Sequence, residues 1–164
     1  MTEPSYDLVV RAGRLVCPKS GLDHPGAIAI RGDRIAAALD DVPETATVPA
    51  RQTLEFPDDL ILPGLVDLHA HPDLGETRVG VDPDLFMLSR GVTTVLSQGD
   101  AGAGNWSDYR DHVIRGVRTR VVPALNLAAC GEEKQGYFAD LEEADVEACV
   151  RTIEQAEGSI WGIS

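Results

Sequence analysis

The chain is poor in aromatic residues and in basic residues, and these shortages exclude several classes of protein. Aromatic residues make up 5% of its 164 positions. Lysine and arginine together number 14, against 27 aspartates and glutamates, which gives a net charge of −13. Nucleic acids and anionic membrane surfaces are bound through basic faces, so we expect neither as a partner. The acidity is typical of a solvated surface.

Cysteines and long apolar runs are also scarce. Cys17, Cys130 and Cys149 are widely spaced and odd in number, so they predict neither a disulfide framework nor a CxxC metal site. We expect reduced thiols in a cytoplasmic protein. No apolar run approaches the roughly 20 residues of a membrane span. The opening residues, MTEPSYD, do not have the basic or apolar character of a signal segment.

Two segments with different patterns follow each other in the sequence. Residues 1–62 contain short β-like runs, including YDLVV, GRLVC and QTLEF. The run GAIAIRGDRIAAAL predicts a hairpin around Gly32 and Asp33, because glycine tolerates the positive φ of a two-residue turn. We therefore predict a small all-β segment over 1–62 and a different architecture over 63–164.

Strands and helices alternate in the second segment. We predict strands over 65–69, 92–97, 119–127 and 159–164, the first of them buried on both faces. Helices are predicted over 82–91, 105–116 and 140–158, with Asp82, Asn105 and Asp140 as N-caps. Asp140 and Glu143 resemble a capping box.

This alternation predicts an α/β fold with a parallel sheet and right-handed crossovers. An open doubly wound sheet is one solution. A (β/α)₈ barrel of the TIM type needs about 250 residues. If the fold is a barrel, these residues hold its N-terminal part, about three and a half β/α units, preceded by a small β-sandwich-like domain.

Two histidines stand at the end of the first strand of this series, in LILPGLVDLHAHPD. His69 and His71 share the parity of a strand, so both project to one side at the carboxyl end, where barrel active sites are built. Imidazole is the commonest metal ligand, and two on one strand end make half of a zinc site. Asp67 has the same parity and is a candidate acceptor for an imidazole N–H. Chance polar residues at a strand end are the alternative, and the Pro-Gly turn and the β/α series favour the metal.

These residues carry a resemblance to a known family. YDLVVRAGRLV, AIAIRGDRIAA and LILPGLVDLHAH resemble, in order and spacing, the opening of the amidohydrolase superfamily of metal-dependent hydrolases. GVTTVLSQGDAGAGNW, RTRVVPALNLAACG and DLEEADVEACVRTIE resemble its amidohydrolase/deacetylase, dihydroorotase-like branch. The resemblance runs from about Tyr6 to the end of the sequence.

The resemblance implies a composite β-sandwich, a metal-binding barrel and one or two divalent ions, most commonly Zn²⁺. In the family the HxH pair is joined by a carboxylated lysine on strand 4, by later histidines and by a catalytic aspartate that shuttles a proton from the metal-activated water. Here only His69 and His71 match. The strand-4 position falls at Ser164, which forms no carbamate. Either the second metal position is lost, or the register differs, or the sequence ends short of the lysine, and the catalytic aspartate is expected beyond its end.

Four loop residues lie near the predicted strand ends. SQGDAGAGN, residues 97–105, is predicted as a βα loop, in which Asp100 and Asn105 are candidate substrate contacts; a phosphate loop is disfavoured because no Lys-Ser/Thr pair follows. Cys130 is predicted to be a packed residue rather than a reactive thiol. Asp73 stands where dihydroorotases carry a carboxylate-binding arginine, which disfavours dihydroorotate as the substrate.

Two functions remain open. The first is a hydrolase of small-molecule amides or acyl esters in a longer protein. The second is a truncated, non-catalytic remnant or partner-binding scaffold, since no further ligand follows Ser164. A sheet with open edge strands pairs with other chains, so we predict that the isolated chain forms homo-oligomers or aggregates.

Overall fold

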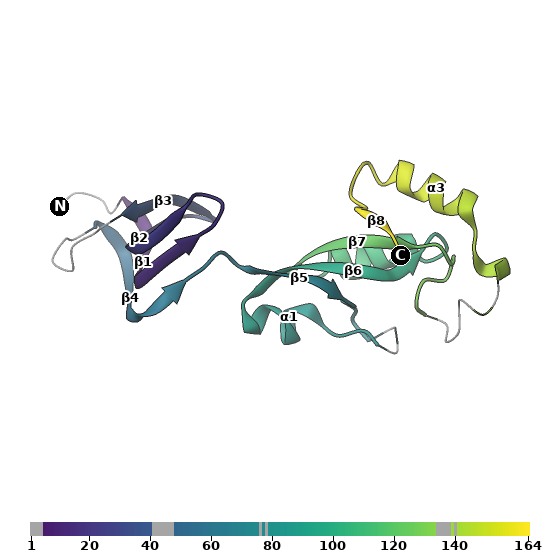
Figure 1. Cartoon of the computed structure of the whole chain (residues 1–164), viewed down its shortest axis with the longest axis horizontal. Helices are drawn as coiled ribbons and strands as arrows, with labels where there is room; N and C mark the ends of the chain where they lie inside the picture. Colours follow the sequence, from purple (N-terminus) through teal and green to yellow (C-terminus); the bar gives the residue numbers. More distant parts are fainter. Residues whose placement is uncertain (1–4, 41–47, 76, 78, 134–138, 140) are drawn as a thin grey trace. The chain divides into compact units, whose positions relative to one another are not determined.

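The computed structural model describes residues 5–40, 48–75, 77, 79–133, 139 and 141–164. The chain divides into two compact units, Met1–Pro63 and Gly64–Ser164, and each contains one four-stranded sheet (Figure 1). Asp140, the predicted cap of the third helix, lies outside the described residues.

The first unit is a mixed sheet with the strand order β3-β2-β1-β4. Its strands are β1 (Tyr6–Cys17), β2 (Leu22–Arg31), β3 (Arg34–Asp40) and β4 (Ala50–Ile61). The predicted hairpin is confirmed, because β2 and β3 are antiparallel and are joined through Gly32 at φ +59°. A small core gathers around Val9, Ala27 and Ala29. That this sheet is half of a sandwich stays a prediction.

The second unit has a parallel sheet with the order β5-β6-β7-β8, as the alternating pattern predicted. Its strands are β5 (Leu65–Ala70), β6 (Val92–Gly102), β7 (Arg120–Asn126) and β8 (Gly162–Ile163). These strands lie side by side in Figure 1. The burial predicted for the first strand is wrong: Leu65, Val66 and Leu68 are at least half exposed, because β5 is an edge strand that, among the described residues, pairs with β6 alone.

Short helices connect these strands. Helix α1 (Pro83–Phe86) begins at Asp82, whose carboxylate accepts the N–H groups of Asp84 and Leu85, and the 3₁₀ turn η1 (Leu88–Arg90) ends at Gly91 with φ +82°. Both predicted boundary residues are thus confirmed. The second predicted helix is divided into α2 (Trp106–Tyr109) and a π-helical turn, η2 (Arg110–Ile114).

The third helix is shorter than predicted. A 3₁₀ turn, η4 (Leu141–Glu143), precedes α3 (Val146–Gln155). The cap of α3 is Asp145, whose carboxylate accepts the N–H of Ala148 at 2.8 Å. The predicted start at residue 140 is therefore too early, because Asp145 caps α3. The predicted capping box includes Asp140, so it lies partly outside the described residues.

Two apolar clusters hold the second unit together. One joins Tyr109, Val113, Leu125 and Cys149, from α2, η2, β7 and α3. The other joins Ala70, Val95 and Val121 across three neighbouring strands. The strand ends next to His71 are therefore held in place by two cores. These cores join residues that are close in the sequence and residues that are far apart in it.

Candidate metal centre

His69 and His71 lie together at the carboxyl end of β5. His69 is within the strand and exposed, while His71 follows the last strand residue and is partly buried. Their ring centroids are 5.5 Å apart and the rings are nearly perpendicular, at 74°. Two imidazoles from one rigid strand end are thus presented to the same region.

The backbone around His71 is held on both sides. The N–H of Val81 donates to the carbonyl of His71 at 2.9 Å, and the N–H of Asp73 donates to the carbonyl of Val81 at 2.9 Å. The side-chain amide of Gln98 donates to the carbonyl of Leu68 at 2.9 Å, which fastens β5 to β6. The histidine segment therefore lies on a fixed backbone.

Asp100 is brought to His71 by a bulge in β6. The register between β6 and β7 shifts between Gln98 and Ala101, and Gly99 there has φ +85°. The side chain of Asp100 is fully buried, and its Oδ1 lies 2.9 Å from His71 Nδ1. The predicted loop over 97–105 is wrong in this part, because the strand continues through the bulge to Gly102 and the bulge re-aims the carboxylate.

Two buried hydroxyl groups lie near the other carboxylate oxygen of Asp100, Oδ2. The hydroxyl of Ser97 donates to Asp100 Oδ2. The hydroxyl of Tyr109 donates to the carbonyl of Pro72 at 2.8 Å and lies 3.2 Å from Ser97 Oγ and 3.4 Å from Asp100 Oδ2. Burial raises the pKa of Tyr109, and the charge of Asp100 adds to the effect, so the phenol stays protonated. Burial also raises the pKa of Asp100, against the hydrogen bonds from Ser97 and His71.

Glu132 was missed by the sequence reasoning. It follows β7, and its Oε2 lies 3.4 Å from His71 Nδ1. Its backbone N–H donates to the carbonyl of Asp100 at 3.1 Å, which docks this loop on the bulge. The carboxyl ends of neighbouring parallel strands meet at one edge, so the position of Glu132 in the loop that follows the third strand was the available signal.

Three side chains therefore converge from three strand ends. One ligand atom from each of His71, Asp100 and Glu132 lies within 4.8 Å of the others. Imidazole and carboxylate are donors that suit zinc and related divalent ions. The Nδ1 of His71 faces the carboxylates of Asp100 and Glu132, at 2.9 and 3.4 Å. The residues at this end of the sheet thus fit a divalent metal.

The other predicted site residues serve neighbouring backbone. The carboxylate of Asp67 accepts the backbone N–H of His69 at 3.0 Å. Asn105 accepts the N–H of Gly102 at 2.8 Å and donates to the Glu133 carboxylate at 2.7 Å and to the Cys130 carbonyl at 3.2 Å. Asn105 precedes α2 as predicted, but its side chain makes no capping hydrogen bond because it fastens two loops together instead. A metal-centre role for Asp67 and substrate contact by Asp100 or Asn105 stay predictions.

Asp73 and Ser164 also lie near this edge. The buried carboxylate of Asp73 accepts hydrogen bonds from the N–H groups of Leu74, at 2.7 Å, and of Thr77. These hydrogen bonds lie within the loop of Asp73 itself. Ser164 follows β8, and its hydroxyl donates to the carbonyl of Gln98 at 3.3 Å. That Ser164 occupies the position of the family's lysine stays a prediction.

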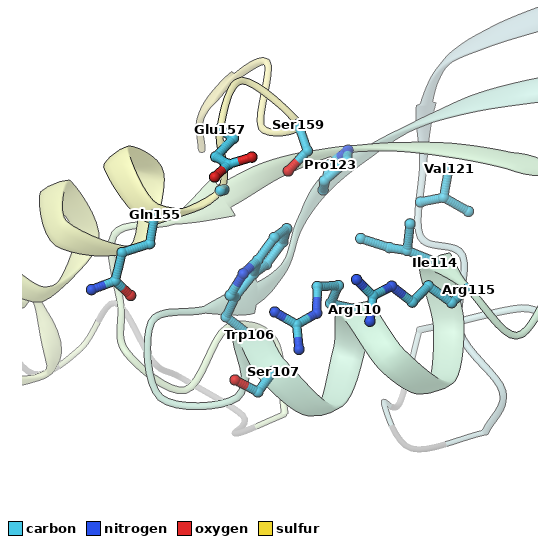
Figure 2. A pocket seen from close by; sticks show the side chains of 11 residues that line it. Trp106, Ser107, Arg110, Ile114, Arg115, Val121, Pro123, Gln155, Glu157 and Ser159 are labelled. Atoms are coloured by element: carbon cyan, nitrogen blue, oxygen red, sulfur yellow. The ribbon is translucent and has the colours of Figure 1, made fainter.

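A separate cavity of about 390 Å³ lies on the helical side of the second unit. Figure 2 shows Trp106, Arg110 and Arg115 facing Glu157 and Ser159 across it. Both arginines pair with Asp111, at 2.9 and 2.8 Å. This cavity contains none of the residues gathered at the strand ends, so it is not part of the candidate metal centre.

Comparison with known proteins finds relatives that are named as deacetylases. No family model matches the chain. A deacetylase of Agrobacterium fabrum is 36% identical over 105 residues, which are 63% of this chain and 25% of that protein. A deacetylase of Enterococcus faecalis is 28% identical over 159 residues, 96% of this chain and 40% of that protein. The chain spans between 16% and 40% of the length of the curated relatives that it matches.

Comparison with solved structures also finds similar hydrolases. A dihydroorotase is 27% identical with a TM-score of 0.82, over 95% of this chain and 41% of that one. An N-acyl-D-glutamate deacylase of Bordetella bronchiseptica, solved with zinc and a phosphonate inhibitor, has a TM-score of 0.61 over 99% of this chain and 38% of that one. It is 18% identical, so it shows a shared fold. In sequence and in fold, this chain is similar to part of hydrolases of the amidohydrolase superfamily.

Proposed function

We propose that this chain forms the front part of a metal-dependent hydrolase that cleaves an amide or acyl-ester bond of a small molecule. The observation that carries the proposal is the convergence of His69 and His71 with two carboxylates at the carboxyl ends of three parallel strands. Active sites of β/α barrels are built at this end. The deacetylase names of two relatives support an acyl substrate.

His69 and His71 would hold the metal, and zinc is the ion we propose. A divalent ion bound there supplies a Lewis acid and lowers the pKa of a bound water. The remaining roles belong to the chain itself. The strand end and the Val81 bridge keep the two rings adjacent, and the buried Asp100 holds the inner nitrogen of His71. Glu132 adds a second carboxylate at the partly exposed side of the same ring.

The test compares histidine variants of the full-length protein. Zinc content is measured by elemental analysis, and hydrolysis is measured on a panel of N-acetylated amino acids and acetyl esters. We expect His69→Ala and His71→Ala to lower zinc affinity by more than the roughly 10–100-fold typical of outer partners, with loss of hydrolysis. His112→Ala is the matched control, because His112 is exposed on η2 and bonds the Asp108 carbonyl. Full zinc content and activity in both site variants would overturn the proposal.

An assembly role is the second candidate, and the exposed edge of the parallel sheet favours it. Leu65, Val66 and Leu68 on β5 are at least half exposed, as are Trp161 and Ile163 near β8. Edge strands with free backbone groups pair with other strands, so we propose a second copy of this chain as the partner. Self-association measured by light scattering, together with site variants that hydrolyse normally, would favour this function over the hydrolase.

The location of the protein in the cell is a separate proposal. No helix in the described part of the chain combines the length and apolar character that a bilayer crossing requires. A cytoplasmic location stays a proposal.

A further inference from the structure

A chain of buried polar groups runs from the core of the second unit to one nitrogen of His71. Asp100 Oδ1 lies 2.9 Å from His71 Nδ1, and Asp100 Oδ2 accepts the hydroxyl of Ser97. Ser97 and Asp100 are fully buried, and Tyr109 is 6% exposed. A buried polar group requires its partners, so each member of this chain restricts the next.

The chain of contacts fixes where the imidazole proton lies. An ionised carboxylate can only accept hydrogen bonds, whereas neutral imidazole has one N–H donor and one acceptor nitrogen. The hydroxyl of Ser97 donates to Asp100 Oδ2 and favours the ionised carboxylate against the effect of burial. The short contact at Oδ1 therefore places the proton on Nδ1. We infer that Asp100 is a positioning residue that holds His71 in the Nδ1–H form and leaves Nε2 as the metal-binding nitrogen.

The anchoring of Asp100 makes this role specific to it. The hydroxyl of Tyr109 lies against both Ser97 and Asp100 and donates to the carbonyl of Pro72, the residue after His71. The network thus holds the carboxylate and the histidine segment against each other.

Glu132 is the competing acceptor. Its Oε2 lies 3.4 Å from the same nitrogen, which is longer than the usual range for an N–H···O hydrogen bond. Its side chain is 16% exposed, whereas that of Asp100 is 0% exposed. The single Nδ1 proton therefore belongs to the contact with Asp100.

The first test needs no substitution. Nitrogen-15 NMR of the metal-free full-length protein at roughly pH 8, above the ordinary imidazole pKa of about 6.5, reports which nitrogen of each histidine carries the proton. These 164 residues contain four histidines, and the signal that disappears in His71→Ala is that of His71. We expect Nδ1–H for His71. An Nε2–H form in the wild type would overturn the inference, whether or not any variant folds.

The second test uses zinc affinity, measured by competition with a chelator. We expect Asp100→Leu to weaken zinc binding about 10–100-fold, as loss of such a partner does in other metal sites. Asp100→Asn keeps an acceptor oxygen and should restore most of the affinity. Asp111→Asn, which removes an exposed carboxylate of the surface pairs, is the control and should bind like the wild type. Weakening by Glu132→Gln with wild-type binding in Asp100→Leu would overturn the assignment.

The metal part of this inference rests on the proposed function, and the two can fail separately. If the wild type binds no zinc, the proposed metal centre fails. The tautomer of His71 in the metal-free protein still decides whether Asp100 positions the ring.

Discussion

Asp100 and Asp84 are two carboxylates at opposite ends of the same parallel sheet, and they are satisfied by different kinds of donor. Asp100 lies near the carboxyl end of β6 and contacts side chains of His71, Ser97 and Tyr109. Asp84 lies in α1 and accepts the backbone N–H groups of Arg118 and Thr119, at 2.8 and 2.7 Å, just before β7 begins. The hydroxyl of Thr119 donates to the same carboxylate at 2.8 Å.

This difference separates a structural carboxylate from a functional one. Backbone N–H groups are fixed by the fold, so Asp84 can only fasten α1 to the start of β7. An imidazole has a second nitrogen that remains available to a ligand, so Asp100 acts on what His71 can bind. Substitutions at the Asp84 end should change stability, and those at the Asp100 end should change both stability and metal binding.

The largest effect on stability is expected from Gly131→Ala, at the Asp100 end. Gly131 has φ +59°, and a Cβ there would lie 2.2 Å from the carbonyl oxygen of Asp100. The strained backbone and the clash should lower the free energy of unfolding by about 3 kcal/mol. Zinc affinity should also fall, because the clash displaces the backbone of Asp100, whose carboxylate contacts His71. Denaturant unfolding and chelator competition measure the two effects.

Gly158→Ala is the matched control for that substitution. Gly158 also has a positive φ, +81°, but no atom of the described residues lies within 4 Å of the added Cβ. Its cost should be about 1 kcal/mol, from backbone conformation alone, with unchanged zinc binding. Equal losses of stability in the two variants would show that the contact with Asp100 is unimportant.

Asp84→Ala should give a smaller loss, confined to stability. Removing the carboxylate leaves the N–H groups of Arg118 and Thr119 without this acceptor, at a cost of about 1–2 kcal/mol; the value is kept low because Asp84 is partly exposed. Thermal or denaturant unfolding measures the loss, and zinc affinity should not change. Weaker zinc binding in this variant would mean that the two ends of the sheet are coupled.

The smallest effect is the pH dependence of the same carboxylate. The hydrogen bond from the backbone N–H of Arg118 is the main cause that holds the pKa of Asp84 below its usual value. The N–H and the hydroxyl of Thr119 add to this effect, and desolvation opposes it. A lowered folded-state pKa contributes stability that is present above the unfolded-state pKa, about 3.9, and is lost as the pH falls through the folded-state value. Wild type should therefore exceed Asp84→Asn in unfolding free energy at neutral pH, by about 1 kcal/mol, and lose this advantage below about pH 4. A difference that does not change with pH would contradict this account.

Local signals predicted the elements well where the partner lies close in sequence. Asp82 caps α1, Gly91 ends η1 and Gly32 turns the β2–β3 hairpin, as their residue types indicated. The third helix begins later than predicted, because Asp145 supplies the cap in place of the earlier acidic residues. A cluster of acidic residues gives several candidate caps, and the sequence alone does not rank them.

Local signals did not predict the contacts between the strand ends. The bulge that extends β6 beyond the predicted strand depends on pairing with β7, and it turns Asp100 from a loop residue into a buried partner of His71. Glu132 reaches the site only because its loop docks on that bulge. The edge position of β5, and hence the exposure of its apolar residues, also depends on which strands are adjacent.

The sequence by itself determined the order of strands and helices, the parallel sheet of the second unit and the pair of histidines at the end of one strand, because periodicity, caps and turns act over a few residues. Only the tertiary structure decided which side chains meet there. Ser97, Asp100, Tyr109 and Glu132 come from different elements, and their contacts with the histidine segment depend on strand register and loop docking, which a local pattern does not encode.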